Sequence, residues 1–86
     1  MRVLHFTKQA QRDARRLAAS GFKSKAQDLF VILELEPWQK PPSYEKLVGY
    51  LAGAYSRRIN IQLRLVYQIL ETEKFVKVSR LWAHHE

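Results

Sequence analysis

The chain has no cysteine among its 86 residues. This absence excludes a disulfide framework and a zinc site built on thiolates. Stability must therefore come from packing alone, which suits a reducing cytoplasm. With 47% of residues apolar or aromatic, we expect a small but adequate core in a single domain over residues 1–86.

Long apolar runs are absent as well. No stretch approaches the roughly 20 residues that cross a bilayer, and residues 1–6 are too short and too polar for a signal peptide. Repeats, linkers and low-complexity segments are also missing. We therefore expect a soluble, cytoplasmic protein without a membrane partner.

Acidic residues are few. Eight Asp and Glu stand against fifteen Lys and Arg, giving a net charge of +7 and a pI of about 10.1. A small basic domain favours polyanions, namely nucleic acid, an anionic membrane surface or an acidic protein. Charge alone does not choose among these partners.

The N-terminal half predicts a strand followed by a helix. Residues 2–6 alternate in the manner of a short strand, and Thr7 is a suitable N-cap for a helix over residues 8–20. Gly21 is a good helix stop. An apolar stripe along this helix consists of Ala10, Ala14, Leu17 and Ala18.

A second helix is expected over residues 24–36, where Pro37 ends it. The two helices form a hairpin whose apolar faces are too small for a stable bundle. They must therefore pack on a sheet supplied by the C-terminal half.

The C-terminal half predicts that sheet. Residues 45–48 indicate a short strand, residues 50–52 a turn-rich link, and residues 54–67 two antiparallel strands joined near 60–63. The last strand is expected over residues 75–82. Strict alternation would place Phe75, Lys77, Ser79 and Leu81 on one of its faces. The order β-α-α-β-β-β predicts an α+β domain with two N-terminal helices on a mostly antiparallel sheet.

Arg58 and Arg64 are predicted to lie close together on the hairpin. Two guanidiniums on rigid strands need an anion, and no acid falls within the run, so an external phosphate is the natural candidate. The alternative is that surface strands carry arginine for solubility and to discourage edge pairing.

Three further residues could carry proton transfer. Glu45 would face the same guanidiniums if its strand lies beside the hairpin, either as a surface ion pair or as a general base. The chain ends in Trp82, Ala83, His84, His85 and Glu86. The adjacent histidines make a weak metal site because neighbours on a strand point to opposite faces, but either imidazole could serve as a general acid.

Together these groups are the parts needed to cleave RNA through its own 2′-hydroxyl. A base removes the 2′ proton, the arginines stabilise the crowded phosphate, and an acid protonates the leaving 5′ oxygen. Such cleavage needs no metal or other cofactor.

The sequence also resembles a known family. Glu45-Lys46-Leu47, the run from Leu51 to Ile59, Arg64-Leu65-Val66-Tyr67, and an aromatic-x-His near the end are similar to the YoeB/Txe toxins of the RelE superfamily. The likeness covers the whole length. It implies a fold like that of microbial ribonucleases, cleavage of mRNA in the ribosomal A site, and silencing by a YefM/Axe-like antitoxin. Members of the family can also form homodimers.

The resemblance assigns roles residue by residue. It implies Glu45 as the base, Arg58 and Arg64 as the phosphate-stabilising pair, and His84 as the catalytic histidine. It also places Lys46 and Arg57 as contacts to RNA. Two positions depart from the family, which usually has tyrosine where this chain has His85 and often has histidine where it has Leu63. The first departure leaves open which imidazole is the acid and whether the toxin is weakened.

The outer helical face has two interpretations. It is either an ordinary solvated face or an attachment surface for ribosomal RNA, and it carries Arg12, Arg15, Arg16, Lys23 and Lys25. Two alternatives to the nuclease stay open. One is a non-catalytic module that occupies the ribosome or binds its antitoxin, and the other is a ParE-like inhibitor of DNA gyrase.

Overall fold

The structure is a computed structural model that describes residues 1–49 and 53–84, with the backbone alone at residues 83 and 84. The link expected at residues 50–52 and His85 lie outside the described residues. The elements are β1 (Val3–Phe6), α1 (Lys8–Ser20), α2 (Lys23–Leu35), β2 (Tyr44–Lys46), β3 (Tyr55–Arg58), β4 (Leu63–Leu70) and β5 (Phe75–His84).

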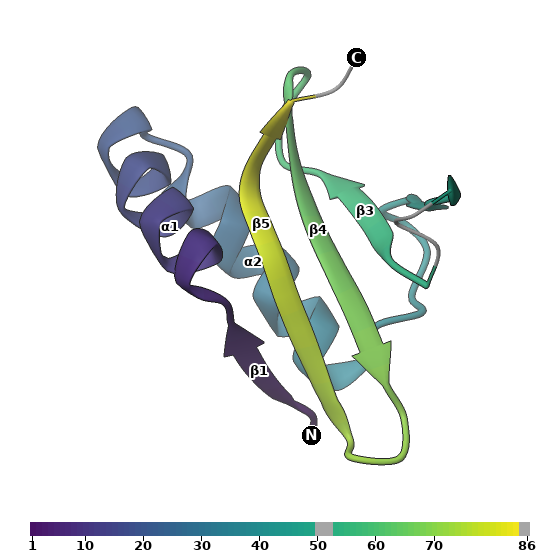
Figure 1. Cartoon of the computed structure of the whole chain (residues 1–86). Helices are drawn as coiled ribbons and strands as arrows, with labels where there is room; N and C mark the ends of the chain where they lie inside the picture. Colours follow the sequence, from purple (N-terminus) through teal and green to yellow (C-terminus); the bar gives the residue numbers. More distant parts are fainter. Residues whose placement is uncertain (50–52, 85–86) are drawn as a thin grey trace.

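In the described part of the chain, five strands form one sheet in the order β1-β5-β4-β3-β2. Strand β1 runs parallel to β5, and the other neighbours are antiparallel. The two helices pack against the sheet beside the long β4 and β5 strands (Figure 1). The predicted α+β class is confirmed, with each helix within one residue of its expected start.

Helix α1 begins and ends as its sequence predicts. The Thr7 hydroxyl accepts a hydrogen bond from the Ala10 amide at 3.1 Å, and Gly21 has φ = 89°. The left-handed conformation at Gly21 favours glycine because a side chain would be strained there. Neither α1 nor any other helix of the described residues is long and apolar enough to cross a membrane.

The core lies between the helices and the sheet, and Leu33, Leu65, Val76, Val78 and Leu81 are fully buried in it. The predicted apolar stripe of α1 is wrong at one position. Ala18 is exposed, whereas Asp13 is buried. Asp13 follows Ala10 by three residues and precedes Leu17 by four, so its side chain shares their face.

The alternation predicted for β5 is also wrong. Leu81 is buried together with Val76 and Val78, not exposed with Lys77. Opposite β4, the register shifts twice, from Tyr67↔Val78 to Val66↔Arg80 and then to Arg64↔Ala83. An extra residue on one strand reverses which face the following side chains occupy, and the first shift therefore turns Leu81 into the core.

Candidate active site

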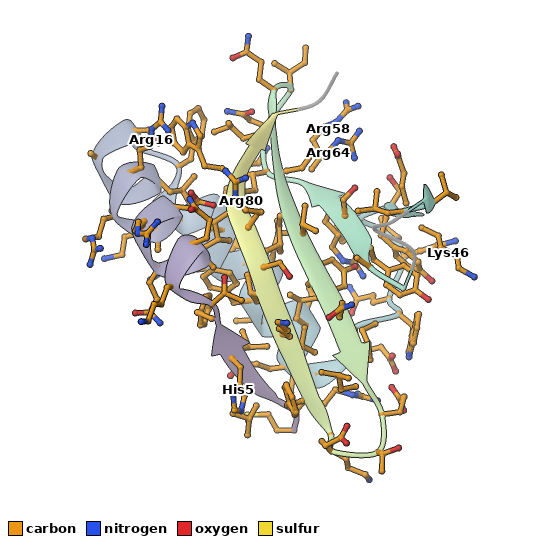
Figure 2. The ribbon with its side chains drawn as sticks, viewed as in Figure 1. His5, Arg16, Lys46, Arg58, Arg64 and Arg80 are labelled. Atoms are coloured by element: carbon orange, nitrogen blue, oxygen red, sulfur yellow. The ribbon has the colours of Figure 1, made fainter. Side chains whose placement is uncertain are left out.

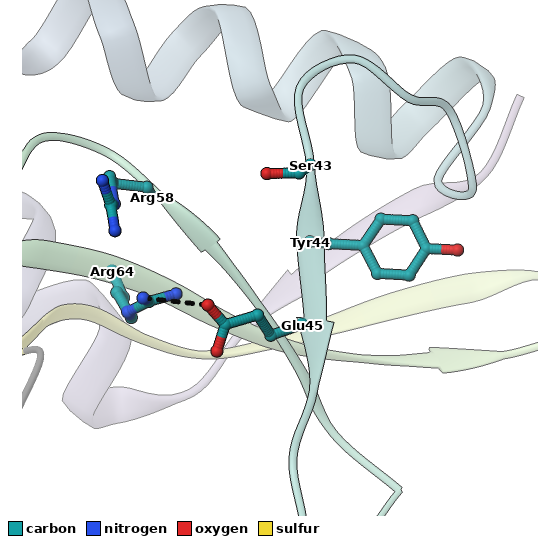
Figure 3. Close-up of a pocket in the computed structure, with 5 residues that line it drawn as sticks. All are labelled: Ser43, Tyr44, Glu45, Arg58 and Arg64. Carbon is teal, nitrogen blue, oxygen red and sulfur yellow. Dashed lines mark hydrogen bonds and ion pairs between the residues drawn. The ribbon is translucent and has the colours of Figure 1, made fainter.

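A polar pocket opens where β2, β3 and β4 meet. It has a volume of about 190 Å³, which holds several water molecules, and its lining is Ser43, Tyr44, Glu45, Arg58 and Arg64. Figure 3 shows the ring of Tyr44 turned away, while Glu45 and the two guanidiniums lie on the same side of β2. The structure thus brings together three of the residues expected to be catalytic.

The hairpin register places the two arginines side by side. Arg58 near the end of β3 pairs directly with Arg64 near the start of β4. Between the strands, the Asn60 side-chain oxygen accepts hydrogen bonds from the Gln62 and Leu63 amides at 2.8 and 2.7 Å. This asparagine turn is local chemistry, and it confirms the predicted hairpin with its junction near residues 60–63.

The guanidinium of Arg64 is held from two sides. Its Nη1 donates to the Ser56 hydroxyl and its Nη2 to Glu45 Oε1, both at 3.1 Å. The Arg64 side chain is only 9% exposed, whereas that of Glu45 is 62% exposed. The buried guanidinium therefore orients a carboxylate whose remaining surface faces solvent.

Arg58 carries the second positive charge of the pocket. It is exposed, and no acidic side chain in residues 1–49 or 53–82 forms an ion pair with it. The lining therefore has two guanidiniums for one carboxylate. An excess of arginine forks at a pocket favours a bound anion such as phosphate.

Arg57 does not fit the predicted RNA contact. It is fully buried and its guanidinium donates to the carbonyl oxygens of Pro37 at 2.8 Å, Gln39 at 2.9 Å, and Pro42. Alternation along β3 sends it to the face opposite Arg58. Its position indicates that it holds the loop leading into β2 and is not available to a nucleic acid.

Aromatic rings surround this buried arginine. The ring of Tyr44 lies 5.0 Å from the Arg57 guanidinium carbon, and the Tyr55 and Tyr67 rings stack at 6.1 Å. Burial raises the pKa of Tyr67 to about 12, against the opposing effect of the nearby Arg57 charge. Among the described residues, the buried hydroxyl of Tyr67 has no hydrogen-bond partner of normal geometry, and Tyr67 belongs to the core.

Lys46 lies next to Glu45 on β2 but does not line the pocket. Its side chain is exposed. Figure 2 shows it apart from Arg58 and Arg64, which lie next to each other. Its contact with RNA stays a prediction.

The end of β5 approaches the pocket from the other side of β4. Ala83 pairs with Arg64, and His84 pairs with Leu63. The backbone of His84 thus lies one pairing position from Arg64. The choice between His84 and His85 as the acid stays a prediction, because His85 is outside the described residues.

Three residues at or near this site were not anticipated. Ser43 lines the pocket, Ser56 holds Arg64, and Asp13 binds the β5 segment before His84. Alternation with Arg58 along β3 is a signal that could have identified Ser56. Alternation with Glu45 could likewise have identified Ser43, and helical spacing puts Asp13 on the face of Ala10 and Leu17. The bonds from Asp13 to β5 arise only through long-range packing.

No family model and no curated protein matches the chain, but solved structures do. A YoeB/ParE toxin from Agrobacterium tumefaciens aligns with a TM-score of 0.87 and 25% identity, over 96% of this chain and 99% of that one. A YoeB-YefM complex from Staphylococcus aureus aligns at 0.82 and 27% identity, over 99% and 100%. A YoeB dimer from the same organism aligns at 0.83 and 27% identity, over 99% and 100%.

The chain therefore shares the fold of the YoeB/RelE toxins and is similar to them over almost its whole length. The resemblance read from its motifs is therefore confirmed by its fold. The pocket with Glu45, Arg58 and Arg64 lies on the hairpin and adjoining strand whose residues carry the resemblance.

Proposed function

We propose that this toxin is a ribosome-dependent endoribonuclease that cleaves mRNA in the ribosomal A site. The observation that carries the proposal is the pocket itself. It holds an exposed carboxylate bonded to a buried guanidinium, with a second guanidinium directly opposite on the hairpin. A base beside a phosphate-binding pair is the arrangement that cleavage through the 2′-hydroxyl requires.

In the first half of the proposed reaction, the Glu45 carboxylate takes the proton of the 2′-hydroxyl. The 2′ oxygen then attacks the adjacent phosphorus and the phosphate becomes crowded and doubly charged. Arg58 and Arg64 stabilise that charge, and donors already in place cost no reorganisation at the moment of reaction. Ser56 and Glu45 hold Arg64 in place for this role.

In the second half, the bond from phosphorus to the 5′ oxygen breaks. An imidazole of His84 or His85 donates a proton to the leaving oxygen. The products are a 2′,3′-cyclic phosphate on one fragment and a 5′-hydroxyl on the other. The reaction uses no cofactor, because acid, base and charge stabilisation all come from side chains.

The proposal extends to partners. A Staphylococcus aureus relative was solved with YefM, which supports a YefM-like antitoxin for this chain. Another was solved as a dimer, which supports self-association. Because the proposed substrate is mRNA on the ribosome, we expect the toxin to act in the cytoplasm. We also expect it to act as one domain over residues 1–86. Lys46 and the outer helical face, with its basic residues on both helices, are the proposed further contacts to RNA.

The decisive experiment maps RNA 5′ ends after brief induction of wild type, Glu45→Gln, His84→Ala and His85→Ala. We expect new 5′-hydroxyl ends within translated codons for wild type and their loss with Glu45→Gln. Loss with only one histidine variant names the general acid.

Two outcomes would replace the proposal. Translation arrest without new RNA ends would mean that the protein acts by binding alone. DNA damage dependent on gyrase would indicate ParE-like activity instead.

A further inference from the structure

A buried carboxylate lies on α1, outside the pocket lining. Asp13 is 3% exposed and belongs to the helix face that also buries Ala10 and Leu17. A charged group in such a place is costly unless hydrogen bonds replace its hydration. The hydrogen-bond donors to Asp13 therefore indicate which part of the chain this carboxylate holds in place.

Most of these partners are on β5. Asp13 Oδ2 accepts hydrogen bonds from the Leu81 amide at 2.9 Å, the Trp82 amide at 3.2 Å and Arg80 Nε at 2.8 Å. Oδ1 accepts from Gln9 Nε2 at 2.9 Å within α1. Burial alone would raise the pKa of Asp13, but the hydrogen bonds from Arg80, Leu81 and Gln9 and the charge of Arg80 together lower it.

The Leu81 and Trp82 amides are free to bond Asp13 because β5 extends beyond the end of its neighbour β1. On one side, β1 pairs with β5 only as far as Val78, and α1 begins directly afterwards. On the other side, the register with β4 moves from Val66↔Arg80 to Arg64↔Ala83, so Leu81 and Trp82 together oppose Leu65. Asp13 thus supplies acceptors at a bulge where no strand is present to do so.

The next residues of β5 lead to the pocket. Ala83 pairs with Arg64 and His84 with Leu63. Beyond the bulge, the described chain is therefore held by β4 along one edge and, two residues before His84, by Asp13 along the other. Arg80, labelled on β5 in Figure 2, adds a third bond to the same carboxylate oxygen.

We propose that Asp13 is a positioning residue that sets the place of His84 relative to Arg64 by fixing the β5 bulge at Leu81 and Trp82. The inference rests on the proposed nuclease function, in which this end of β5 supplies the acid. Asp13 touches no reacting atom. Its effect belongs to the chemical step, because a displacement of about 1 Å at a reacting group can lower a rate about 100-fold.

The test uses purified full-length toxin with ribosomes programmed by an mRNA. Asp13→Asn keeps the shape of the side chain but has one acceptor oxygen instead of two, so it cannot satisfy all four donors. Gln9→Ala is a matched control that removes a donor to the same carboxylate without touching β5. Leu29→Ala, a core change on α2, controls for lost stability.

We expect Asp13→Asn to lower kcat roughly 10- to 100-fold with KM for the ribosome unchanged. Gln9→Ala and Leu29→Ala should retain the wild-type kcat per folded molecule. Amide exchange at Leu81 and Trp82 should be slow in wild type and faster in Asp13→Asn, with a shift of the His84 imidazole resonance. Asp13→Glu, which moves the carboxylate by one methylene, should show the same changes and replaces Asp13→Asn if that variant does not fold.

A wild-type kcat in Asp13→Asn, or an equal loss in a Leu29→Ala protein of the same stability, would overturn the inference. So would Leu81 and Trp82 amides that exchange as fast in wild type as exposed ones. Failure of the proposed function looks different, because wild type itself would leave the mRNA intact. The exchange rates and the His84 resonance would then still decide whether Asp13 sets the end of β5.

Discussion

The molecule contains two carboxylate–arginine pairs with opposite patterns of burial. In the pair of Asp13 with Arg80, joined at 2.8 Å, the aspartate side chain is 4% exposed and the arginine side chain 42%. In the pair of Glu45 with Arg64, joined at 3.1 Å, the glutamate side chain is 62% exposed and the arginine side chain 9%. The same two functional groups therefore meet in two different environments.

The difference in burial distinguishes a carboxylate with a structural role from one that is open to a substrate. The buried carboxylate of Asp13 has both oxygens occupied by donors, so it stabilises the fold and is closed to a substrate. The exposed carboxylate of Glu45 accepts a hydrogen bond from Arg64 and faces a cavity. Which partner is buried decides whether the carboxylate is available for proton transfer.

The largest expected effect is on the chemical step. Arg64→Ala should lower mRNA cleavage by about 10²- to 10³-fold, because it removes a preorganised donor to the developing phosphate charge. Cleavage of mRNA on programmed ribosomes measures this loss. Arg2→Ala, which removes an equal charge from an ion pair with Glu71, should cleave at the wild-type rate. A folded Arg64→Ala protein with full activity would show that Arg64 does not stabilise the phosphate at this site.

The next effect is on stability and contrasts the two carboxylates. Asp13→Ala should lower the free energy of unfolding by about 2–3 kcal/mol, since it leaves two backbone amides buried without acceptors. Glu45→Ala should change it by less than about 0.5 kcal/mol, because exposed ion pairs contribute little. Urea unfolding at pH 7 measures both. Equal losses of unfolding free energy in the two variants would contradict the view that Asp13 is structural and Glu45 is not.

Acid should weaken the protein through Asp13. The pKa of Asp13 is lowered in the folded chain, so the unfolded chain, with an aspartate pKa near 3.9, binds this proton more readily. The stability from Asp13 is therefore fully present above about pH 4 and is lost as pH falls through the lowered pKa. Urea midpoints of wild type should drop over this range more steeply than those of Asp13→Asn. Parallel curves would show that Asp13 does not contribute.

The smallest effect concerns a buried polar group that lacks the partners of Asp13. Tyr67→Phe should change the free energy of unfolding at pH 7 by less than about 0.5 kcal/mol, because no described residue bonds the hydroxyl at normal hydrogen-bond geometry. Above pH 10 the two proteins should diverge. The raised pKa of Tyr67, about 12, means that wild type should lose more stability than the variant as pH rises from 10 to 12. A loss above about 1 kcal/mol at pH 7 would reveal a partner for the hydroxyl.

Much of the fold is readable from local signals. Thr7 and Gly21 mark the ends of α1, Asn60 closes the hairpin, and alternation pairs Arg58 with Arg64. Each of these features depends on residues within a few positions of one another. Local backbone chemistry and side-chain periodicity are therefore sufficient to predict them.

Other features depend on contacts between distant parts of the chain. Arg57 and Arg58 are neighbours of the same type, yet one is buried against carbonyls 15 to 20 residues away and the other is exposed at the pocket. The bulges in β5 change the phase of its alternation, and no composition signal marks them. Periodicity cannot foresee them because it assumes an unbroken ladder.

By itself, therefore, the sequence determined the α+β class, the hairpin that pairs two arginines, and the candidates for acid and base. Only the tertiary structure decided which charged groups are closed off and which are open. The bond from Arg64 to Glu45 spans 19 positions and that from Leu81 to Asp13 spans 68. Burial is a property of how elements pack, so it separates a structural carboxylate from a reactive one only once the fold has formed.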